Sequence, residues 1–361
     1  MNDNRAILHS DLNSFYASVE MMLDPSLKGK AVAVCGSTEN RHGIVLAKSD
    51  LAKKAGVKTG MVNWEARQLC KDLIMVPPQY DQYLKYSKLT RSIYDRYTDQ
   101  VEPFGMDECW LDVTGSRVQG SPMEIAEQIR KSVREELGLT VSIGVSFNKI
   151  FAKLGSDMKK PDAITEITKE EFKEKVWPLH CSEMIYCGPA TTKKLAMFGI
   201  NTIGDVANTD PAFLKQVLGV NGLSLWAFAS GNDTSRVMHK DFVSPIKSVG
   251  HGITCNADLV NEDEVFRVML ELSQDVGHIM CSLQTEKALK AKSLLMNYLT
   301  RSANDWNHIS LQTKMYLTLL MAILIGGRRK KKPLVMTRAR RQMNDGSARI
   351  NLFSQGTHTN R

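Results

Sequence analysis

The sequence predicts an α+β fold with a central sheet, followed by a small helical domain. Segments with strand and helix periodicity alternate up to about residue 165, and strand patterns are absent from about residue 167 to 232. The length of 361 residues also exceeds what one hydrophobic core usually supports, so two to four modules are expected. Alternation alone leaves an α/β arrangement of the first module open.

The first 70 residues contain three predicted strands. An apolar stretch near the N-terminus predicts a strand whose C-terminal end holds Asp11, and the segment KAVAVCG at 30–36 predicts a second strand. Residues 43–70 then predict a third strand, a helix ended by Gly56, a turn at Gly60 and another helix.

The central part of the chain continues this alternation. Apolar residues at helical spacing predict a helix within 83–99, and the segment EPFGMDECWLDVT at 102–114 predicts a strand pair. Residues 124–138 predict an amphipathic helix with Gly138 just past its end, and the β-branched residues of 139–146 predict a strand.

The chain changes character after this region. Residues 191–200 and 210–231 predict short helices separated by glycine turns. Residues 240–254 are rich in turn formers and basic residues, so we interpret them as a tether into a further domain, in which 261–280 predicts a helix.

Composition argues against several classes of protein. The N-terminus lacks a basic start followed by an apolar run, and no stretch reaches the roughly 18 apolar residues of a membrane span. We therefore expect a cytoplasmic protein with no membrane partner. Seven cysteines without a CxxC pair indicate reduced thiols rather than a disulfide framework or a zinc site.

The formal net charge of +8 is unevenly distributed along the chain. Residues 280–361 carry 15 Lys and Arg against 3 Asp and Glu, whereas the first 279 residues carry 32 against 36. Net positive charge favours a polyanionic partner, but a solvated or disordered run, GGRRKKK at 326–332, explains it equally well.

Two adjacent carboxylates, Asp107 and Glu108, lie inside an apolar run. Neighbouring side chains of an ideal strand point to opposite faces, so both acids can reach one site only if the backbone turns, as Gly105 permits. The alternative is an exposed hairpin tip, but Asp11 is a third acid at the end of another predicted strand.

Three converging carboxylates require positive charge. At 4 Å and an effective dielectric near 20, each pair repels by about 4 kcal/mol. Two magnesium ions about 3.5 to 4 Å apart, held by shared carboxylates, would neutralise the acids and are the apparatus of phosphoryl transfer.

Four segments occur in the chain in this order: SDLNSFYASVE, GMDECWLD, SIGVSFNKIFAKLGSDMKKP and CGPATTKKL. From residue 6 to about 292, the sequence resembles the Y-family of translesion DNA polymerases, particularly the bacterial DNA polymerase IV type. The resemblance implies an error-prone, template-directed enzyme that transfers nucleotides from dNTPs to a primer 3′ hydroxyl and releases pyrophosphate. Primer-template DNA and dNTPs are the implied partners, and a monomer is expected.

The resemblance also implies a right-hand fold. Its parts are a palm at 1–10 and 78–166, fingers at 11–77, a helical thumb at 167–239, a tether at 240–254, a little finger at 255–347 and a tail at 348–361. After about residue 292 the expected alternation and family pattern are lost. This loss indicates an aberrant little finger, from a shifted reading frame or a degraded gene end.

By resemblance, Asp11, Asp107 and Glu108 are the catalytic residues and hold two Mg²⁺ ions together with the carbonyl of Leu12. The nucleotide-binding residues that the resemblance implies are Phe15, Tyr16, Lys53 and Lys160.

Tyr16 would be the steric gate, whose ring collides with the 2′ hydroxyl of a ribonucleotide. Without the resemblance, Tyr16 would be a core aromatic of an N-terminal helix, and Lys53 and Lys160 would be ordinary surface lysines. Many relatives carry Arg where Lys53 stands, and Lys lacks the bidentate fork of Arg, so the triphosphate contact at Lys53 should be less directional. Asp50 departs from a Tyr found nearby in some relatives, so the resemblance does not imply the triphosphate contact of that Tyr here.

Two further segments resemble binding elements. Gly188, Pro189 and Ala190 resemble the turn of a helix-hairpin-helix, whose backbone amides approach a DNA phosphate, although an ordinary helical connection is the alternative. Near the C-terminus, the sliding-clamp peptide of bacterial polymerases is matched at Ile350, Leu352 and Phe353. Arg349 stands there in place of the expected Gln, and the alternative is a chance match.

Two other functions remain open at this point. Nucleotidyl cyclases also use palm-like sheets with paired acids and two metals, although the Tyr16 gate and the hairpin thumb count against a cyclase. A chain that keeps its acids but lacks a working little finger would be a weak DNA binder or an inactive relic.

Overall fold

The computed structural model describes residues 5–37, 43–246 and 248–282. The chain divides into two units, Met1–Gly36 with Ile44–Phe242 and Ser37–Gly43 with Val243–Arg361. The division after Phe242 lies inside the predicted tether at 240–254.

The first unit contains a five-stranded sheet with the strand order β5-β6-β1-β7-β8. The strands from β5 to β7 pair antiparallel, and β8 joins β7 in parallel. These strands are β1 (Ile7–Leu12), β5 (Val101–Pro103), β6 (Glu108–Asp112), β7 (Val141–Ser146) and β8 (Ile164–Ile167). The mostly antiparallel pairing confirms the α+β prediction over the α/β alternative. β1 extends to Leu12, two residues past the expected palm boundary.

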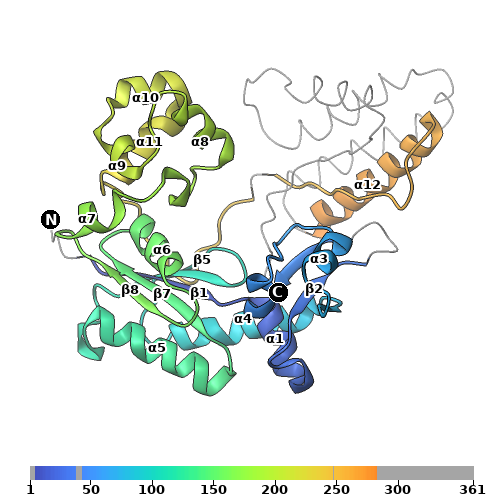
Figure 1. Ribbon diagram of the computed structural model, residues 1–361, viewed down its shortest axis with the longest axis horizontal. Helices are drawn as coiled ribbons and strands as arrows, with labels where there is room; N and C mark the ends of the chain where they lie inside the picture. The colour runs from blue at the N-terminus through green and yellow to red at the C-terminus, as the bar shows by residue number, and fades with distance from the viewer. Residues whose placement is uncertain (1–4, 38–42, 247, 283–361) are drawn as a thin grey trace. The chain divides into compact units, whose positions relative to one another are not determined.

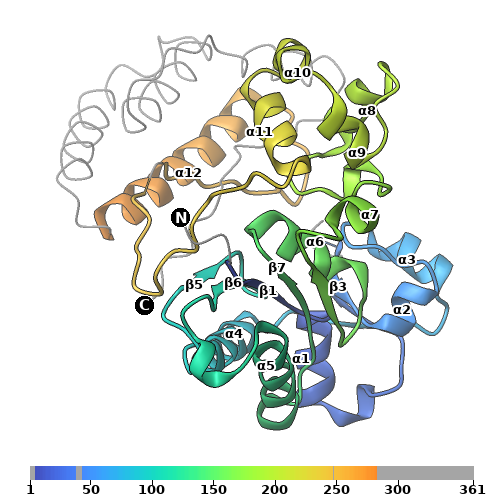
Figure 2. The ribbon, with the colours of Figure 1, turned by 90° about the vertical axis from the view of Figure 1, so that its left-hand side faces the viewer.

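Helices cover both faces of this sheet. α6 (Lys149–Met158) lies on one face, and α4 (Tyr80–Tyr94) and α5 (Pro122–Leu137) lie on the other (Figures 1 and 2). α6 packs directly onto β7, because a Cβ atom added to Gly144 would lie 1.9 Å from the carbonyl oxygen of Ala152. Only glycine permits this approach, which brings the polar side chains of α6 close to β1 and β6.

A second sheet, with the order β3-β2-β4, is separate from the first. Its strands are β2 (Val32–Cys35), β3 (Val45–Lys48) and β4 (Ile74–Val76), and the helices of this region are α1 (Phe15–Leu23), α2 (Asp50–Lys54) and α3 (Asn63–Leu69). One apolar core of this sheet includes Ala33, Val45, Ala52 and Ala66, whereas Val34 of β2 belongs to the core of the five-stranded sheet. The strands up to residue 165 thus form two sheets rather than one central sheet, because periodicity identifies strands but not their pairing partners.

The rest of the first unit is helical, as predicted. It contains α7 (Phe172–Val176), α8 (Pro189–Ala196), α9 (Ile203–Asn208), α10 (Pro211–Leu218) and α11 (Val220–Ala229). Short 3₁₀ helices lie at Pro25–Leu27, Arg117–Gln119 and Cys181–Glu183. Helices α7 to α11 pack around a shared apolar core that includes Val176, Leu195, Ile203, Leu214 and Leu225.

The described part of the second unit contains α12 (Glu262–Ser282), which confirms the predicted helix at 261–280. Asp275 of this helix pairs with His251, with 2.9 Å between Oδ2 and Nδ1. The divergent segment after residue 292 and the clamp-like peptide at Ile350, Leu352 and Phe353 lie outside the described residues.

Two expectations from composition can be compared with the residues that the structure describes. No helix among them is both long and apolar enough to cross a membrane. Six cysteines whose side chains the structure describes are free thiols, as predicted: Cys35, Cys70, Cys109, Cys181, Cys187 and Cys255.

Candidate active site

The three predicted acids meet at one end of β1 and β6. Asp11 and Glu108 lie directly opposite each other in the sheet. Asp107 precedes Glu108, and its carbonyl oxygen accepts a hydrogen bond from the backbone N–H of Leu12 at 3.0 Å. Between β5 and β6 the chain turns at Gly105, whose φ of 95° lies in the left-handed region that favours glycine. The predicted turn is confirmed, and it brings both acids of the apolar run next to Asp11.

Two lysines from α6 and the loop after it contact these acids. Lys153 Nζ lies 3.1 Å from Glu108 Oε1 and 3.6 Å from Asp11 Oδ2, so it bridges the two strands. Lys160 Nζ lies 2.6 Å from Asp11 Oδ2. Asp157 contacts both ammonium groups, at 3.0 Å from Lys153 and 2.8 Å from Lys160. The predicted nucleotide-binding residue Lys160 is therefore part of the acidic site.

The lysines neutralise the acids only in part. Burial raises the pKa of Asp11 to about 6, although Lys160 opposes this shift. Burial and the charge of Glu108 raise the pKa of Asp107. Burial also acts against the ionised form of Glu108, but His9 and Lys153 outweigh it and lower the pKa of Glu108 to about 2. Additional positive charge would stabilise the ionised forms of Asp11 and Asp107.

The donor set fits a hard divalent cation. Carboxylate oxygens are the ligands that Mg²⁺ prefers, and Asp11 Oδ2 and Glu108 Oε1 already face one shared cation, the ammonium group of Lys153. With the side chains as they lie, no three His, Cys, Asp or Glu residues in the described ranges form a group that could hold a metal ion. The ammonium groups of Lys153 and Lys160 lie among the acids instead, where positive charge is needed.

Tyr16 lies on α1 and is supported by aromatic residues of α4. Its ring is stacked on Tyr83, with centroids 4.1 Å apart and an interplanar angle of 9°, and Tyr80 meets it edge-on at 6.2 Å. Tyr83 is fully buried, and its hydroxyl donates a hydrogen bond to the buried carboxylate of Glu20. Burial and the charge of Asp107 raise the pKa of Tyr16 to about 12. Tyr16 is thus held on a rigid support beside the acids.

Two predicted nucleotide-binding side chains are not brought to the acids. Phe15 is 3% exposed and belongs to the apolar core of the five-stranded sheet. Lys53 is exposed on α2, and its charge lies close enough to Lys48 to lower the pKa of Lys48 in addition to the effect of burial. Within the described part of the chain, the structure gives neither side chain a contact with the acids.

The helix-hairpin-helix residues lie at the start of α8. Gly188 caps this helix and Pro189 occupies its first turn, the usual place for proline. Both residues and Ala190 are exposed, so the unpaired N–H groups of the helix N-terminus face solvent. This arrangement suits contact with a phosphate.

Sequence reasoning missed three polar residues of the site: His9, Lys153 and Asp157. Lys153 and Asp157 are four residues apart on a helix, a spacing that is visible in the sequence and indicates an ion pair. His9 precedes Asp11 by two residues, so it shares the same face of β1. Only the position of α6 on this face shows that the three residues surround the acids.

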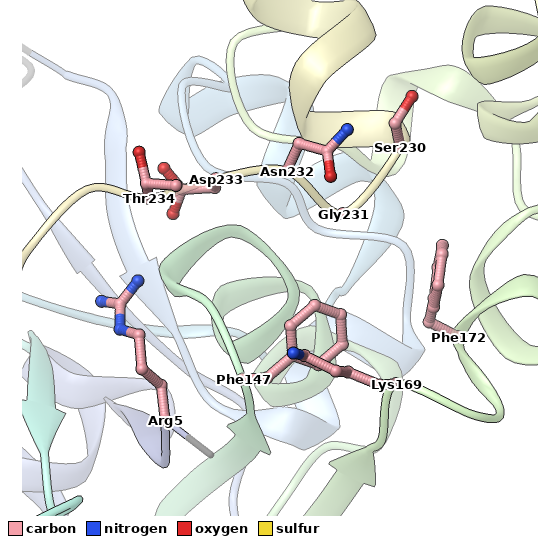
Figure 3. A pocket seen from close by; sticks show the side chains of 9 residues that line it. All are labelled: Arg5, Phe147, Lys169, Phe172, Ser230, Gly231, Asn232, Asp233 and Thr234. Atoms are coloured by element: carbon pink, nitrogen blue, oxygen red, sulfur yellow. The ribbon is translucent and has the colours of Figure 1, made fainter. Parts of the chain in front are cut away.

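A separate cavity of about 420 Å³ lies between the start of β1, the end of β7 and the segment after α11 (Figure 3). Arg5, Phe147, Lys169 and Asp233 are among its lining residues, and the three acids are not. Arg5 donates to the carbonyl oxygen of Ser235 at 2.7 Å, and the Lys169 ammonium lies 5.6 Å from the ring centre of Phe147. These cations are engaged by the protein itself, so the acidic site remains the candidate active site.

Comparisons with known proteins show the family of the chain. The model of the impB/mucB/samB family matches residues 10–157, which contain all three acids. The chain is 53% identical over 274 residues to DNA polymerase IV of Acetivibrio thermocellus, covering 76% of this chain and 69% of that protein. It is 39% identical over 312 residues to DNA polymerase IV 1 of Bacillus subtilis, covering 86% and 73%.

Solved structures give the same result. A Y-family DNA polymerase chimera matches with a TM-score of 0.68 and 26% identity, covering 75% of this chain and 79% of the chimera. DinB from Sulfolobus solfataricus matches with a TM-score of 0.59 and 29% identity, covering 64% and 69%. Y-family polymerases depend on divalent cations, in agreement with the donor set. The chain therefore belongs to the Y-family of DNA polymerases, in its DNA polymerase IV group, and is a DNA-directed DNA polymerase of translesion synthesis.

Proposed function

We propose that this polymerase, which binds DNA and dNTPs, holds two magnesium ions with Asp11, Asp107 and Glu108, helped by the carbonyl of Leu12. The main support is the direct pairing of Asp11 with Glu108 across β1 and β6, next to Asp107. When bound, the ions activate the primer 3′ hydroxyl and neutralise the leaving pyrophosphate. The raised pKa values of Asp11 and Asp107 indicate a site that lacks positive charge without them.

Lys153 and Lys160 have a second role in this proposal. In the protein alone they neutralise the acids, at 3.1 Å from Glu108 and 2.6 Å from Asp11. Ions at the acids would repel these ammonium groups, and the dNTP triphosphate offers them a new partner of opposite charge. A lysine supplies a point charge without the planar fork of Arg, so it follows the phosphates as they move.

Two other elements complete the proposed nucleotide and DNA contacts. The Tyr16 ring, fixed by Tyr83, excludes the 2′ hydroxyl of a ribonucleotide. The exposed start of α8, at Gly188, Pro189 and Ala190, binds a phosphate of the primer-template duplex through backbone N–H groups. Such a contact positions the duplex without reading its sequence.

Primer extension with and without a divalent cation tests the two-metal proposal. On an undamaged primer-template, the full chain should extend the primer with Mg²⁺, lose extension when EDTA is added, and regain it with excess Mg²⁺. Binding of the primer-template, measured by fluorescence anisotropy, should persist in EDTA, because the acids act on the metals rather than on the duplex. Primer extension in EDTA would refute the metal requirement. DNA binding without primer extension in Mg²⁺ would instead favour an inactive DNA-binding protein.

We further propose that a sliding clamp binds the tail, and this proposal is supported by the sequence alone. Ile350, Leu352 and Phe353 would fill an apolar pocket on the clamp, whereas Arg349 cannot supply the hydrogen bonds of the usual Gln. A peptide covering 346–357 should bind the host clamp with micromolar or weaker affinity, and Phe353→Ala should remove this binding. Equal binding by both peptides would exclude this contact.

A further inference from the structure

His9 is a buried residue of the active site to which the mechanism above gives no role. It lies directly opposite Trp110 in the pairing of β1 with β6, two pairs away from Asp11 and Glu108. Residues two apart on a strand share a face, so His9, Asp11, Glu108 and Trp110 all point toward α6. The side chain of His9 is 0% exposed, and its ring meets Trp110 edge-on at 5.2 Å.

The two ring nitrogens of His9 face two different groups. Nδ1 lies 2.8 Å from the hydroxyl oxygen of Ser156 on α6. Nε2 lies 3.3 Å from Glu108 Oε2, and each of these two buried atoms lacks any other hydrogen-bond partner. The remaining oxygen of the carboxylate, Glu108 Oε1, faces Lys153 at 3.1 Å. The two oxygens of Glu108 therefore have separate neighbours.

The surroundings also determine which nitrogen carries the proton. Nε2 faces the carboxylate oxygen Glu108 Oε2 and has no other hydrogen-bond partner, so this contact is attractive only when Nε2 carries a proton. The Ser156 hydroxyl donates to the carbonyl oxygen of Lys153 at 2.7 Å, and the same hydroxyl oxygen lies 2.8 Å from Nδ1. When this hydroxyl turns its proton to Nδ1 instead, Nδ1 accepts and the ring proton lies on Nε2, pointing at Glu108.

We propose that His9 is a positioning residue that holds Glu108 by Oε2, so that Oε1 is presented to the cation site next to Asp11. This inference rests on the proposed two-metal function. A glutamate carboxylate rotates freely about its last bond unless one oxygen is held. Groups that orient a metal ligand from behind typically contribute 10- to 100-fold to metal affinity or activity. His9 should therefore matter for the metal affinity of the site and not for DNA binding.

Binding of Mn²⁺ alone to the full chain, followed by the electron paramagnetic resonance of the free ion, tests the proposal without relying on activity. His9→Phe keeps a ring of similar size and removes both nitrogens, and it should weaken Mn²⁺ binding about tenfold. His9→Gln keeps an N–H donor within reach of Glu108 and should stay within about threefold of the unmodified protein. In primer extension, raised Mn²⁺ should recover most of the rate of His9→Phe, while its primer-template affinity stays unchanged.

Two further variants make the result decisive. Asp11→Asn should weaken Mn²⁺ binding more than His9→Phe does, because it removes a ligand. If Asp11→Asn lowers Mn²⁺ affinity and His9→Phe does not, the metal site stands and the role of His9 is refuted. If the unmodified chain does not bind Mn²⁺, the two-metal function and this inference both fail.

Ser156→Ala tests the same inference without changing the ring. It removes the hydroxyl that can donate to Nδ1 of His9 and so favours the ring form with its proton on Nε2. The loss should weaken Mn²⁺ binding a few-fold. If His9→Phe does not fold, as judged by circular dichroism, this variant decides the question. Unchanged affinity in Ser156→Ala would then overturn the proposal.

Discussion

Replacing Asp107 or Glu108 by Ala is expected to lower the rate of nucleotide incorporation by about 10³-fold or more, while primer-template affinity stays within a few-fold. Glu108 begins β6 opposite Asp11 and Asp107 directly precedes it, and neither acid belongs to the exposed surface of α8 that would bind the duplex. The loss should therefore appear in single-turnover incorporation and not in anisotropy measurements of DNA binding.

Asp112→Asn is the matched control, because Asp112 is an acid at the opposite end of β6. Its carboxylate accepts a hydrogen bond from the backbone of Thr114 at 3.0 Å, which an Asn oxygen can also accept. This variant should keep its activity. Ordinary extension by Asp107→Ala or Glu108→Ala at normal Mg²⁺ would remove that acid from the catalytic role.

The thermal midpoint of Asp107→Ala should not fall in the absence of metal. Burial and the charge of Glu108 raise the pKa of Asp107 in the folded protein. A carboxyl group with a raised folded-state pKa destabilises the folded state once the pH exceeds its unfolded pKa, so at neutral pH its removal relieves a cost. Differential scanning calorimetry in EDTA measures this effect, and a lower midpoint would mean that Asp107 has a stabilising partner.

Replacing Tyr16 by Ala is expected to raise ribonucleotide incorporation roughly 10- to 100-fold relative to deoxynucleotides. Crowding a packed site costs about 1 to 3 kcal/mol, and each 1.4 kcal/mol corresponds to a factor of ten. The Tyr16 ring cannot yield to the 2′ hydroxyl, since Tyr83 lies parallel to it at 4.1 Å and is itself buried. The ratio of kcat/KM for matched rNTP and dNTP measures the change.

Tyr16→Phe is the control for the gate, because it keeps the ring and removes only the hydroxyl. It should discriminate between the sugars almost as well as the unmodified enzyme, whereas Tyr16→Ala should not. The same sugar preference in both variants would show that another residue is the gate. A parallel loss of dNTP and rNTP incorporation in Tyr16→Ala would instead indicate a role in general packing.

The sequence alone determined the local elements around the site. A short apolar stretch predicted β1 and placed Asp11 near its end, and Gly105 predicted the turn that brings Asp107 and Glu108 to the start of β6. Gly138 predicted the end of α5, which the structure places at Leu137. These features depend on the conformational preferences of a few neighbouring residues, so they can be read from a short stretch of chain.

The sequence did not determine how the strands are grouped. The predicted strands up to residue 165 form two sheets, since β2, β3 and β4 pair only with one another. The strands Ile74–Val76 and Ile164–Ile167 were not predicted. Pairing depends on which apolar faces can be buried together over the whole domain, and this is not a property of any single segment.

The polar surroundings of the acids were decided by tertiary structure alone. Lys153 contacts Glu108 and His9 contacts Ser156 because Gly144 lets α6 approach the sheet closely. In the sequence, Lys153 is one of many lysines and His9 precedes an acid by two positions without any sign of a partner. Local preference determines where strands and turns form, but the charges that a buried carboxylate meets depend on long-range packing, because only packing brings distant side chains within hydrogen-bond distance.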